Sequence, residues 1–322
     1  MQEGDAPPAI KESSRKVIFA AVIANLGIAG AKFAVALLTG SAAMMAEGIH
    51  SAVDTGNELL LLVGEKMSNL PPSPRHPFGY GKAIYFWALL VALSVFTLGG
   101  GLSIYHGVQA LRRPEPIANP FWNYLVLAIA AGFEGYSWNV SRKALNQVRK
   151  SGSSLWQAVH NSKDASVFTV FIEDSTALIG VAIAALGIGL GQIFDNPYFD
   201  PAASVAVGLL LVGAAVTLAR ETGALLVGEG IGREQTGRLR EIFCSDPGIM
   251  TVGRLLTMQL GPDEVLLTAA VLFKRGMRID EVEEAIRRLE AKVREANPAI
   301  QHIYFKSAGL ADGEAPKDEP AC

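Results

Sequence analysis

The 322-residue chain carries 28 Lys and Arg and 31 Asp and Glu, so 18% of it is charged, against about 25% in typical soluble domains. Residues 1–220 hold 29 of these 59 charges and residues 221–322 hold 30. This split excludes a single soluble globule and a disordered chain, and two cysteines, Cys244 and Cys322, exclude a disulfide-rich module. The net charge of −3 gives no sign of nucleic-acid binding. A membrane domain followed by a soluble domain is predicted.

Six stretches reach the roughly 20 mainly apolar residues that a membrane-spanning helix needs. They are 17–38, 42–64, 83–111, 120–140, 167–192 and 201–219. Lys and Arg concentrate in the N-terminal arm 1–16 and in alternate loops, whereas the opposite loops hold only Arg112 and Arg113. We therefore expect residues 17–220 to form a six-helix transmembrane domain with both termini in the cytoplasm. In a bacterial host this places the protein in the inner membrane.

The pattern after Arg220 predicts a small soluble α+β domain over 221–308. Its expected elements are a helix at 235–244, strands at 250–256 and 265–273, an amphipathic helix at 279–296 and a strand at 300–306. This order indicates a cytoplasmic, ferredoxin-like domain. The tail 309–322 has no apolar periodicity and is expected to be disordered.

Ionisable residues inside predicted spans are costly and point to function. The second span carries His50 and Asp54, which are i,i+4 neighbours on one helix face. The fifth span carries Glu173 and Asp174 near its start. Imidazole with carboxylates suits Zn²⁺ and its first-row neighbours, whereas Ca²⁺ or Mg²⁺ would be expected to use oxygen alone. The open alternative is that His50 and Asp54 only bond each other and join two helices.

Other polar residues of the spans have less specific expectations. Glu47 and Glu58 are expected in structural roles near the ends of the second span, and Lys32 is expected to extend its ammonium towards the outer surface. Glu134 on the fourth span is either a site residue or a partner between helices. Four glycines are expected to allow close helix approach: Gly27, Gly30, Gly180 and Gly187.

Three motifs follow one another along the chain: Gly40–Ser41, His50-x-x-x-Asp54 and the heptapeptide HPFGYGK at 76–82. Together they resemble the cation diffusion facilitator family of metal-ion/proton antiporters. The resemblance covers about residues 15–308. The segment 133–137 is similar to the branch that includes mitochondrial and nuclear-associated zinc carrier homologues.

The resemblance implies a metal site made of two residues four apart on the second span and two more on the fifth. His50, Asp54 and Asp174 match three of these positions, but the fourth is Val170, which cannot bind a metal. Glu173, a water or Glu134 would then complete the site.

Two further metal sites of the family lack ligands in this chain. In the loop after the second span His76 is present, but Ser73 and Tyr80 stand at other ligand positions. In the soluble domain only His302 remains, because Gly253, Ala269 and Phe305 stand where ligands would be.

The resemblance thus implies a homodimeric, proton-coupled antiporter that exports a divalent transition metal, Zn²⁺ foremost, by alternating access. Lys82 and Glu229 are expected to pair at the hinge of the dimer. Alternatives are the same transport of Mn²⁺, Fe²⁺, Co²⁺ or Ni²⁺, or a membrane metal sensor or scaffold without transport. The expected partners are the metal ion, protons, the lipid bilayer and a second copy. An enzyme is disfavoured, because His-Glu-x-x-His and a nucleophile pair are absent from the sequence, and no cofactor is expected.

Overall fold

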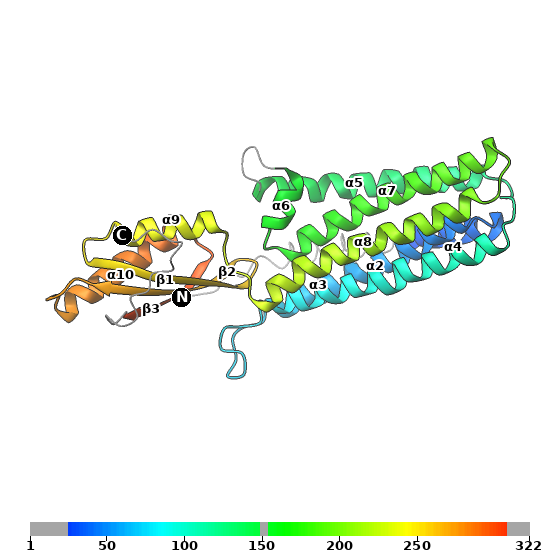
Figure 1. The fold of residues 1–322 in the computed structure, drawn as a ribbon. Helices are drawn as coiled ribbons and strands as arrows, with labels where there is room; N and C mark the ends of the chain where they lie inside the picture. Colours follow the sequence, from blue (N-terminus) through cyan, green and yellow to red (C-terminus); the bar gives the residue numbers. More distant parts are fainter. Residues whose placement is uncertain (1–24, 149–153, 308–322) are drawn as a thin grey trace. The chain divides into compact units, whose positions relative to one another are not determined.

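The computed structural model describes residues 25–148 and 154–307, which divide by their contacts into two units (Figure 1). The helical unit comprises residues 25–63, 87–148, 154–159 and 166–221. The β unit comprises residues 64–86, 160–165 and 222–307, so it includes loop and helix-end segments beside the predicted soluble domain. The expected arm 1–16, the start of the first span and the expected tail 309–322 lie outside the described residues.

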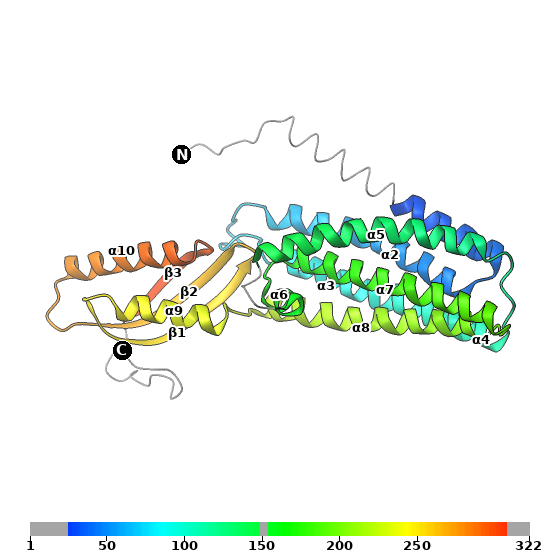
Figure 2. The ribbon, with the colours of Figure 1, turned by 90° about the horizontal axis from the view of Figure 1, so that it is seen from above.

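Long helices make up the helical unit and run side by side in both views (Figures 1 and 2). They are the helical segment Asn25–Thr39, α2 (Ala42–Ser68), α3 (Ala83–Ser94), α4 (Leu102–Arg112), α5 (Phe121–Val148), α7 (Ala165–Ile193) and α8 (Phe199–Val227), with the short α6 (Leu155–Asn161) before α7. A π-helical turn, η1 (Val95–Gly101), joins α3 and α4 into one continuous helix.

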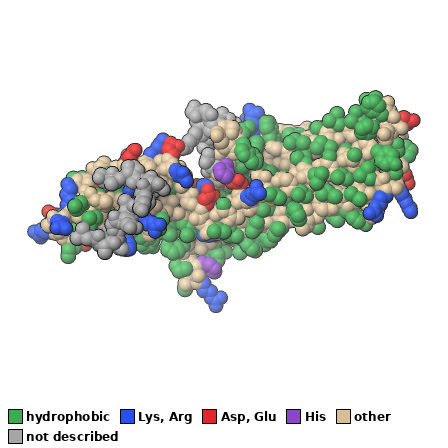
Figure 3. Space-filling model, in the orientation of Figure 1, with side chains coloured by type: hydrophobic (Ala, Val, Ile, Leu, Met, Phe, Trp, Pro, Cys, Tyr) green, Lys and Arg blue, Asp and Glu red, His purple; other side chains and the backbone are tan. Residues whose placement is uncertain are grey.

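Three of the described helices are both long and apolar enough to cross a membrane: Ala83–Arg112, α7 and α8. The 27 residues of α2 and the 28 of α5 are also sufficient in length, but both helices carry several charged side chains. Large apolar side chains face outward on this unit, such as Leu37 and Ile193, each 76% exposed (Figure 3). A soluble protein would bury such residues, so the helical unit is of the membrane type.

The Gly40–Ser41 motif forms the turn between the segment Asn25–Thr39 and α2. Gly40 has φ +75°, a conformation that favours glycine. The Ser41 hydroxyl accepts a hydrogen bond from the Met44 amide (3.1 Å) and so caps α2. It also donates to Asp200 at the start of α8, and the Asp200 carboxylate accepts from the Ala42 amide (2.6 Å). The N-terminus of α2 is therefore held by both its own cap and α8.

Replacing Asp200 by Ala is expected to lower the melting temperature of the detergent-solubilised protein by several degrees. The change leaves the Ser41 hydroxyl and the Ala42 amide without their acceptor, at a cost of about 1–3 kcal/mol. Asp200→Asn keeps one acceptor oxygen and should lose less. Equal melting temperatures for the Ala variant and the unmodified protein would contradict this capping role.

Glycines let two pairs of helices approach closely. A Cβ at Gly100 of η1 would lie 2.7 Å from Val212 of α8, and one at Gly187 of α7 would lie 2.4 Å from Ala203. At Gly180 a Cβ would meet the end of the Glu47 side chain at 2.5 Å, whereas a Cβ at Gly27 or Gly30 would meet no atom of the described residues within 4 Å. The expected role in close packing is thus wrong for Gly27 and Gly30.

The β unit contains the expected order of helix, two strands, helix and strand. Its elements are α9 (Arg233–Cys244), β1 (Ile249–Gly261), β2 (Glu264–Phe273), α10 (Ile279–Ala296) and β3 (Ile300–Ser307). The sheet has the order β1-β2-β3, antiparallel between β1 and β2 and parallel between β2 and β3. Alternate side chains of β2, from Val265 to Val271, enter a core with Phe243 of α9 and Leu289 of α10. β1 extends beyond the predicted 250–256, up to the turn at Gly261.

An ion pair between a buried carboxylate and a partly exposed guanidinium joins the turn after α9 to α10. The Asp246 carboxylate accepts hydrogen bonds from the Arg288 guanidinium (3.1 and 3.2 Å) and from the Gly248 amide (2.9 Å). Burial alone would raise the pKa of Asp246, but the bonds from Arg288 and Gly248 hold it below its usual value. A carboxyl group with a lowered pKa in the folded state stabilises the fold above its unfolded pKa of about 3.9.

Arg288→Gln is therefore expected to reduce the stability of the β unit near neutral pH, with a smaller effect in acid. The contribution is lost as the pH falls through the folded pKa of Asp246, because the protonated carboxyl group no longer attracts the guanidinium. Hydrogen-exchange protection of β1 and α10 in the full-length protein, corrected for intrinsic rates, would measure this at about pH 7 and about pH 3. An equal loss of protection at both values would refute the linkage.

Candidate metal centre

The centre begins with the pair His50 and Asp54 on α2. His50 Nδ1 lies 3.2 Å from Asp54 Oδ2, as expected for residues four apart on one helix. His50 is only 1% exposed, and its second ring nitrogen, Nε2, has no hydrogen-bond partner among the described residues. An imidazole buried in this way is costly, because its polar atoms have left water without a full replacement.

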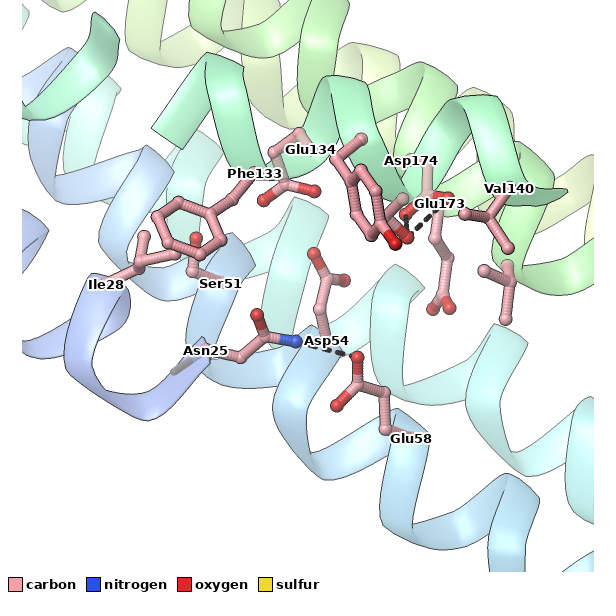
Figure 4. A pocket seen from close by; sticks show the side chains of 13 residues that line it. Asn25, Ile28, Ser51, Asp54, Glu58, Phe133, Glu134, Val140, Glu173 and Asp174 are labelled. Atoms are coloured by element: carbon pink, nitrogen blue, oxygen red, sulfur yellow. Dashed lines mark hydrogen bonds between the residues drawn. The ribbon is translucent and has the colours of Figure 1, made fainter. Parts of the chain in front are cut away.

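Next to this pair lies a cavity of about 370 Å³, seen in Figure 4. Its walls come from the segment Asn25–Thr39, α2, α5 and α7. The lining residues are Asn25, Ile28, Ser51, Asp54, Glu58, Phe133, Glu134, Tyr136, Ser137, Val140, Val170, Glu173 and Asp174. Five of them are carboxylates, and the side chains of Asp54 and Glu134 approach each other from α2 and α5 in Figure 4. So many acidic groups at one place in a membrane-type domain mark a site for cations.

The two carboxylates of α7 are held by neutral side chains of neighbouring helices. Asp174 accepts hydrogen bonds from Ser137 (2.9 and 3.0 Å) and from Ser141 (3.1 Å), both on α5. Glu173 accepts one from Asn57 of α2 (2.7 Å). These bonds orient the carboxylates while leaving lone pairs free for an ion, since each carboxylate has about four acceptor positions.

The structure brings the predicted ligands together only in part. Asp54, Glu173 and Asp174 line the same cavity as the possible ligand Glu134, and His50 contacts Asp54. Within residues 25–148 and 154–307, however, no three His, Cys, Asp or Glu side chains lie close enough to hold one ion. Ser137 and Ser141 hold Asp174 towards α5, whereas Asn57 holds Glu173 towards α2. A shared ion would require a shift of these side chains towards His50 and Asp54.

The structure corrects the expectations for Lys32 and the ends of α2. Lys32 does not extend outward: its side chain is fully buried, and its ammonium lies 2.9 Å from Glu47 Oε2. The physical reason is that Glu47 and Ser51, one turn apart on α2, offer two acceptors in the interior. Glu58 accepts a hydrogen bond from Asn25 (2.7 Å) and lines the cavity. Glu47 and Glu58 thus belong to the surroundings of the centre.

Sequence reasoning missed Ser137, Ser141 and Asn57, which hold the carboxylates of α7. A signal was present, because Glu134, Ser137 and Ser141 are spaced i, i+3 and i+7 and must share one helix face. Ser and Asn are common in membrane helices as neutral interhelical partners. The spacing alone therefore does not identify which residue of a neighbouring helix they bind.

The polar residues at the two further metal sites of the family contact other side chains. Ser73 and Tyr80 are hydrogen-bonded to each other (3.2 Å), and the Tyr80 ring lies tilted against that of His76, with the ring centroids 4.3 Å apart. In the β unit, His302 is paired with Glu264 (2.7 Å). The three positions without ligand atoms occupy β1, β2 and β3: Gly253, Ala269 and Phe305.

The expected pairing of Lys82 with Glu229 is not the one found. The Glu229 carboxylate lies 3.0 Å from the ammonium of Lys163, whereas the Lys82 ammonium reaches the Leu226 carbonyl at 3.5 Å. The Glu229 carbonyl accepts from the Gln259 amide (2.9 Å), which fixes Glu229 beside β1. This position favours Lys163, from the segment before α7, as the partner.

Comparison with known proteins agrees with the membrane type of the helical unit. Residues 18–227 match the family model of the cation efflux transmembrane domain. The mitochondrial proton-coupled zinc antiporter SLC30A9 of Mus musculus is 32% identical over 89% of this chain and 58% of its own length. Metal tolerance protein C4 of Arabidopsis thaliana is 27% identical over 83% of this chain and 58% of its own length. The manganese efflux system protein MneP of Bacillus subtilis is 25% identical over 92% and 96%.

The chain spans little more than half the length of the first two of these relatives, so their full activities do not transfer to it directly. The family itself is shown by the match over 18–227, which takes in the helices from the segment Asn25–Thr39 to α8. This chain is a multi-pass membrane protein and belongs to the cation diffusion facilitator family.

Proposed function

We propose that this protein is a proton-coupled antiporter that exports Zn²⁺ from the cytoplasm. His50, Asp54 and Asp174 bind the ion, with Glu173 or Glu134 in the fourth position. The observation that carries this proposal is the buried His50, whose Nδ1 contacts Asp54 at the edge of a cavity lined by five carboxylates, and whose Nε2 has no partner among the described residues. One imidazole with two or three carboxylates is a donor set suited to tetrahedral Zn²⁺.

The same side chains couple the metal to protons. A metal ligand must be deprotonated, so an ion that enters from the cytoplasm displaces protons from His50 and its carboxylate neighbours. Protons that arrive from the opposite side then displace the ion. Asp174 moves between its serine partners on α5 and the ion, and the helices rock about this centre in alternating access.

The proposed architecture follows the sequence prediction. Residues 17–220 form six spans, and 221–308 form a ferredoxin-like domain in the cytoplasm with both termini. The helix lengths and the αββαβ order of α9 to β3 support this arrangement. The Lys and Arg of alternate loops support the orientation, which places the protein in the inner membrane of a bacterial host.

A homodimer is proposed because one face of the sheet in the β unit exposes large apolar side chains. Leu256 on β1 is 57% exposed and lies in one row with Thr268 of β2 and Tyr304 of β3. Met250 and Met258 are also exposed on β1. A second copy of this chain can cover this face by packing the same surface against it.

Leu256→Glu is therefore expected to shift the purified protein from dimer to monomer, because it places a charge in the centre of the apolar contact. Light scattering coupled to size exclusion measures the mass of the protein in detergent. Arg287→Glu, on an exposed position of α10, is the control and should remain dimeric. A dimer that persists in Leu256→Glu would place the interface elsewhere.

The proposal is tested by flux in proteoliposomes. A proton gradient of either direction across the vesicle membrane should drive Zn²⁺ in the direction opposite to the protons. Mn²⁺, Fe²⁺, Co²⁺ and Ni²⁺ are then added as competing substrates. If the protein transports one of these ions in preference to Zn²⁺, that ion is the substrate. Binding of Zn²⁺ without flux would instead support a sensor or scaffold.

A further inference from the structure

A fully buried cluster lies beside the metal centre and takes no part in the proposed coordination. Lys32, on the segment Asn25–Thr39, donates hydrogen bonds to Glu47 (2.9 Å) and to the Ser51 hydroxyl (2.7 Å), both on α2. The side chains of Lys32 and Glu47 are both inaccessible to solvent. An ion pair buried in a membrane-type domain is a weak source of stability, because desolvation of the two charges opposes their attraction. Its presence therefore calls for a role other than stability.

Glu47 also contacts the helix that carries the other half of the centre. Its second oxygen, Oε1, is buried and has no hydrogen-bond partner among the described residues. A Cβ at Gly180 of α7 would lie 2.5 Å from this oxygen, so any larger residue at this position would displace the Glu47 carboxylate. Gly180 lies on the same helix as Asp174. The carboxylate of Glu47 is thus held between Lys32 on one side and the backbone of α7 on the other.

The cluster adjoins the ligands of α2 directly. Ser51 follows His50 in the sequence and lines the cavity together with Asp54. Two points on α2, Glu47 and Ser51, are therefore attached to one ammonium group, which restricts the rotation of the helix about its axis. The residues between and beyond these points include His50 and Asp54, so the direction of both ligands depends on this attachment.

We propose that Lys32 is a positioning residue for the transported ion. Through Glu47 and Ser51 it fixes the rotation of α2 and the spacing between α2 and α7, so that His50 and Asp54 face the helix of Asp174. This inference rests on the proposed function, because it concerns the same metal centre. It assigns to the Lys32 ammonium and to Gly180 a part in ion affinity, although neither can bind the ion.

The test is calorimetric titration of Zn²⁺ into the purified full-length protein, on monodisperse material only. Lys32→Met is expected to raise the dissociation constant at least about tenfold, because Glu47 loses its partner and α2 its attachment. The exchange variant Lys32→Glu with Glu47→Lys rebuilds the ion pair in reverse and should recover much of the affinity. A merely structural role would reduce the yield of folded protein and leave the affinity of that protein unchanged.

Gly180→Ala tests the same inference without altering any charge. The added methyl group displaces Glu47 and should also weaken Zn²⁺ binding by about tenfold. Gly187→Ala is its matched control on α7, because the crowding there comes from Ala203 of α8 and not from the cluster. It should lower the melting temperature but keep the affinity. If Lys32→Met does not fold, Gly180→Ala and Gly187→Ala together still test the positioning role.

Failure of this inference and failure of the proposed function are distinguishable. If the unmodified protein does not bind Zn²⁺, the proposed function is wrong and the inference falls with it. If the unmodified protein binds Zn²⁺ and Gly180→Ala binds it equally well, the positioning role is overturned while the function stands.

Discussion

Asp54→Asn is expected to weaken Zn²⁺ binding by at least about 100-fold and to abolish exchange against protons. The amide is a poorer metal ligand than the carboxylate, and it removes the charge that lies 3.2 Å from His50 Nδ1. The effect should be larger than that of any single change around the cavity, because Asp54 both contacts His50 and lines the wall opposite α7. Zinc titration and flux in proteoliposomes measure the two consequences separately.

Glu65→Gln is the matched control for this prediction, because it makes the same chemical change on an exposed position of α2. It should bind and transport as the unmodified protein does. Flux near the unmodified rate in Asp54→Asn would exclude Asp54 as a ligand and would remove the basis of the proposed centre.

Val170→Asp is expected to raise Zn²⁺ affinity about tenfold or more, which corresponds to about 1.4 kcal/mol. Val170 lines the cavity one helical turn before Asp174, so an Asp there supplies the carboxylate that the family resemblance leads one to expect. Tighter binding should slow the release of the ion, so the maximal rate of flux should fall while the apparent affinity rises.

Val170→Asn is the control for the added charge, because Asn has nearly the same shape as Asp but is a weaker metal ligand. A large gain with Asp and a small gain with Asn would indicate direct coordination. Unchanged affinity in Val170→Asp would mean that the ion is bound away from this turn of α7, and Glu134 would then be the better candidate for the fourth ligand.

The sequence alone predicts the long helices and the elements of the β unit, because apolar periodicity and turn residues are local properties. It also predicts that His50 and Asp54 are neighbours, since helical spacing fixes this geometry. The Gly40–Ser41 motif is explained by the structure: the glycine adopts φ +75° and the serine caps α2. These features depend on residues within a few positions of one another.

Features that depend on contacts between helices could not be predicted from local sequence patterns. The pairing of Lys32 with Glu47 joins residues of two helices, and hydrophobicity alone suggested an outward-facing lysine. The pairing of Glu229 with Lys163 joins segments 66 positions apart, and many other lysines were available. The serines that hold Asp174 belong to α5, whose rotation against α7 is set by packing. Tertiary contacts decide the partner in each case.

X-ray absorption of the zinc-loaded protein tests the central claim most directly, namely that His50 and the carboxylates of α2 and α7 hold the ion together. It should show one imidazole per Zn²⁺ at about 2.0–2.1 Å, oxygen ligands at about 2.0–2.2 Å and no sulfur. The imidazole signal should disappear in His50→Ala loaded with excess zinc. A site with sulfur, with no imidazole, or with an imidazole that persists in His50→Ala would contradict the account.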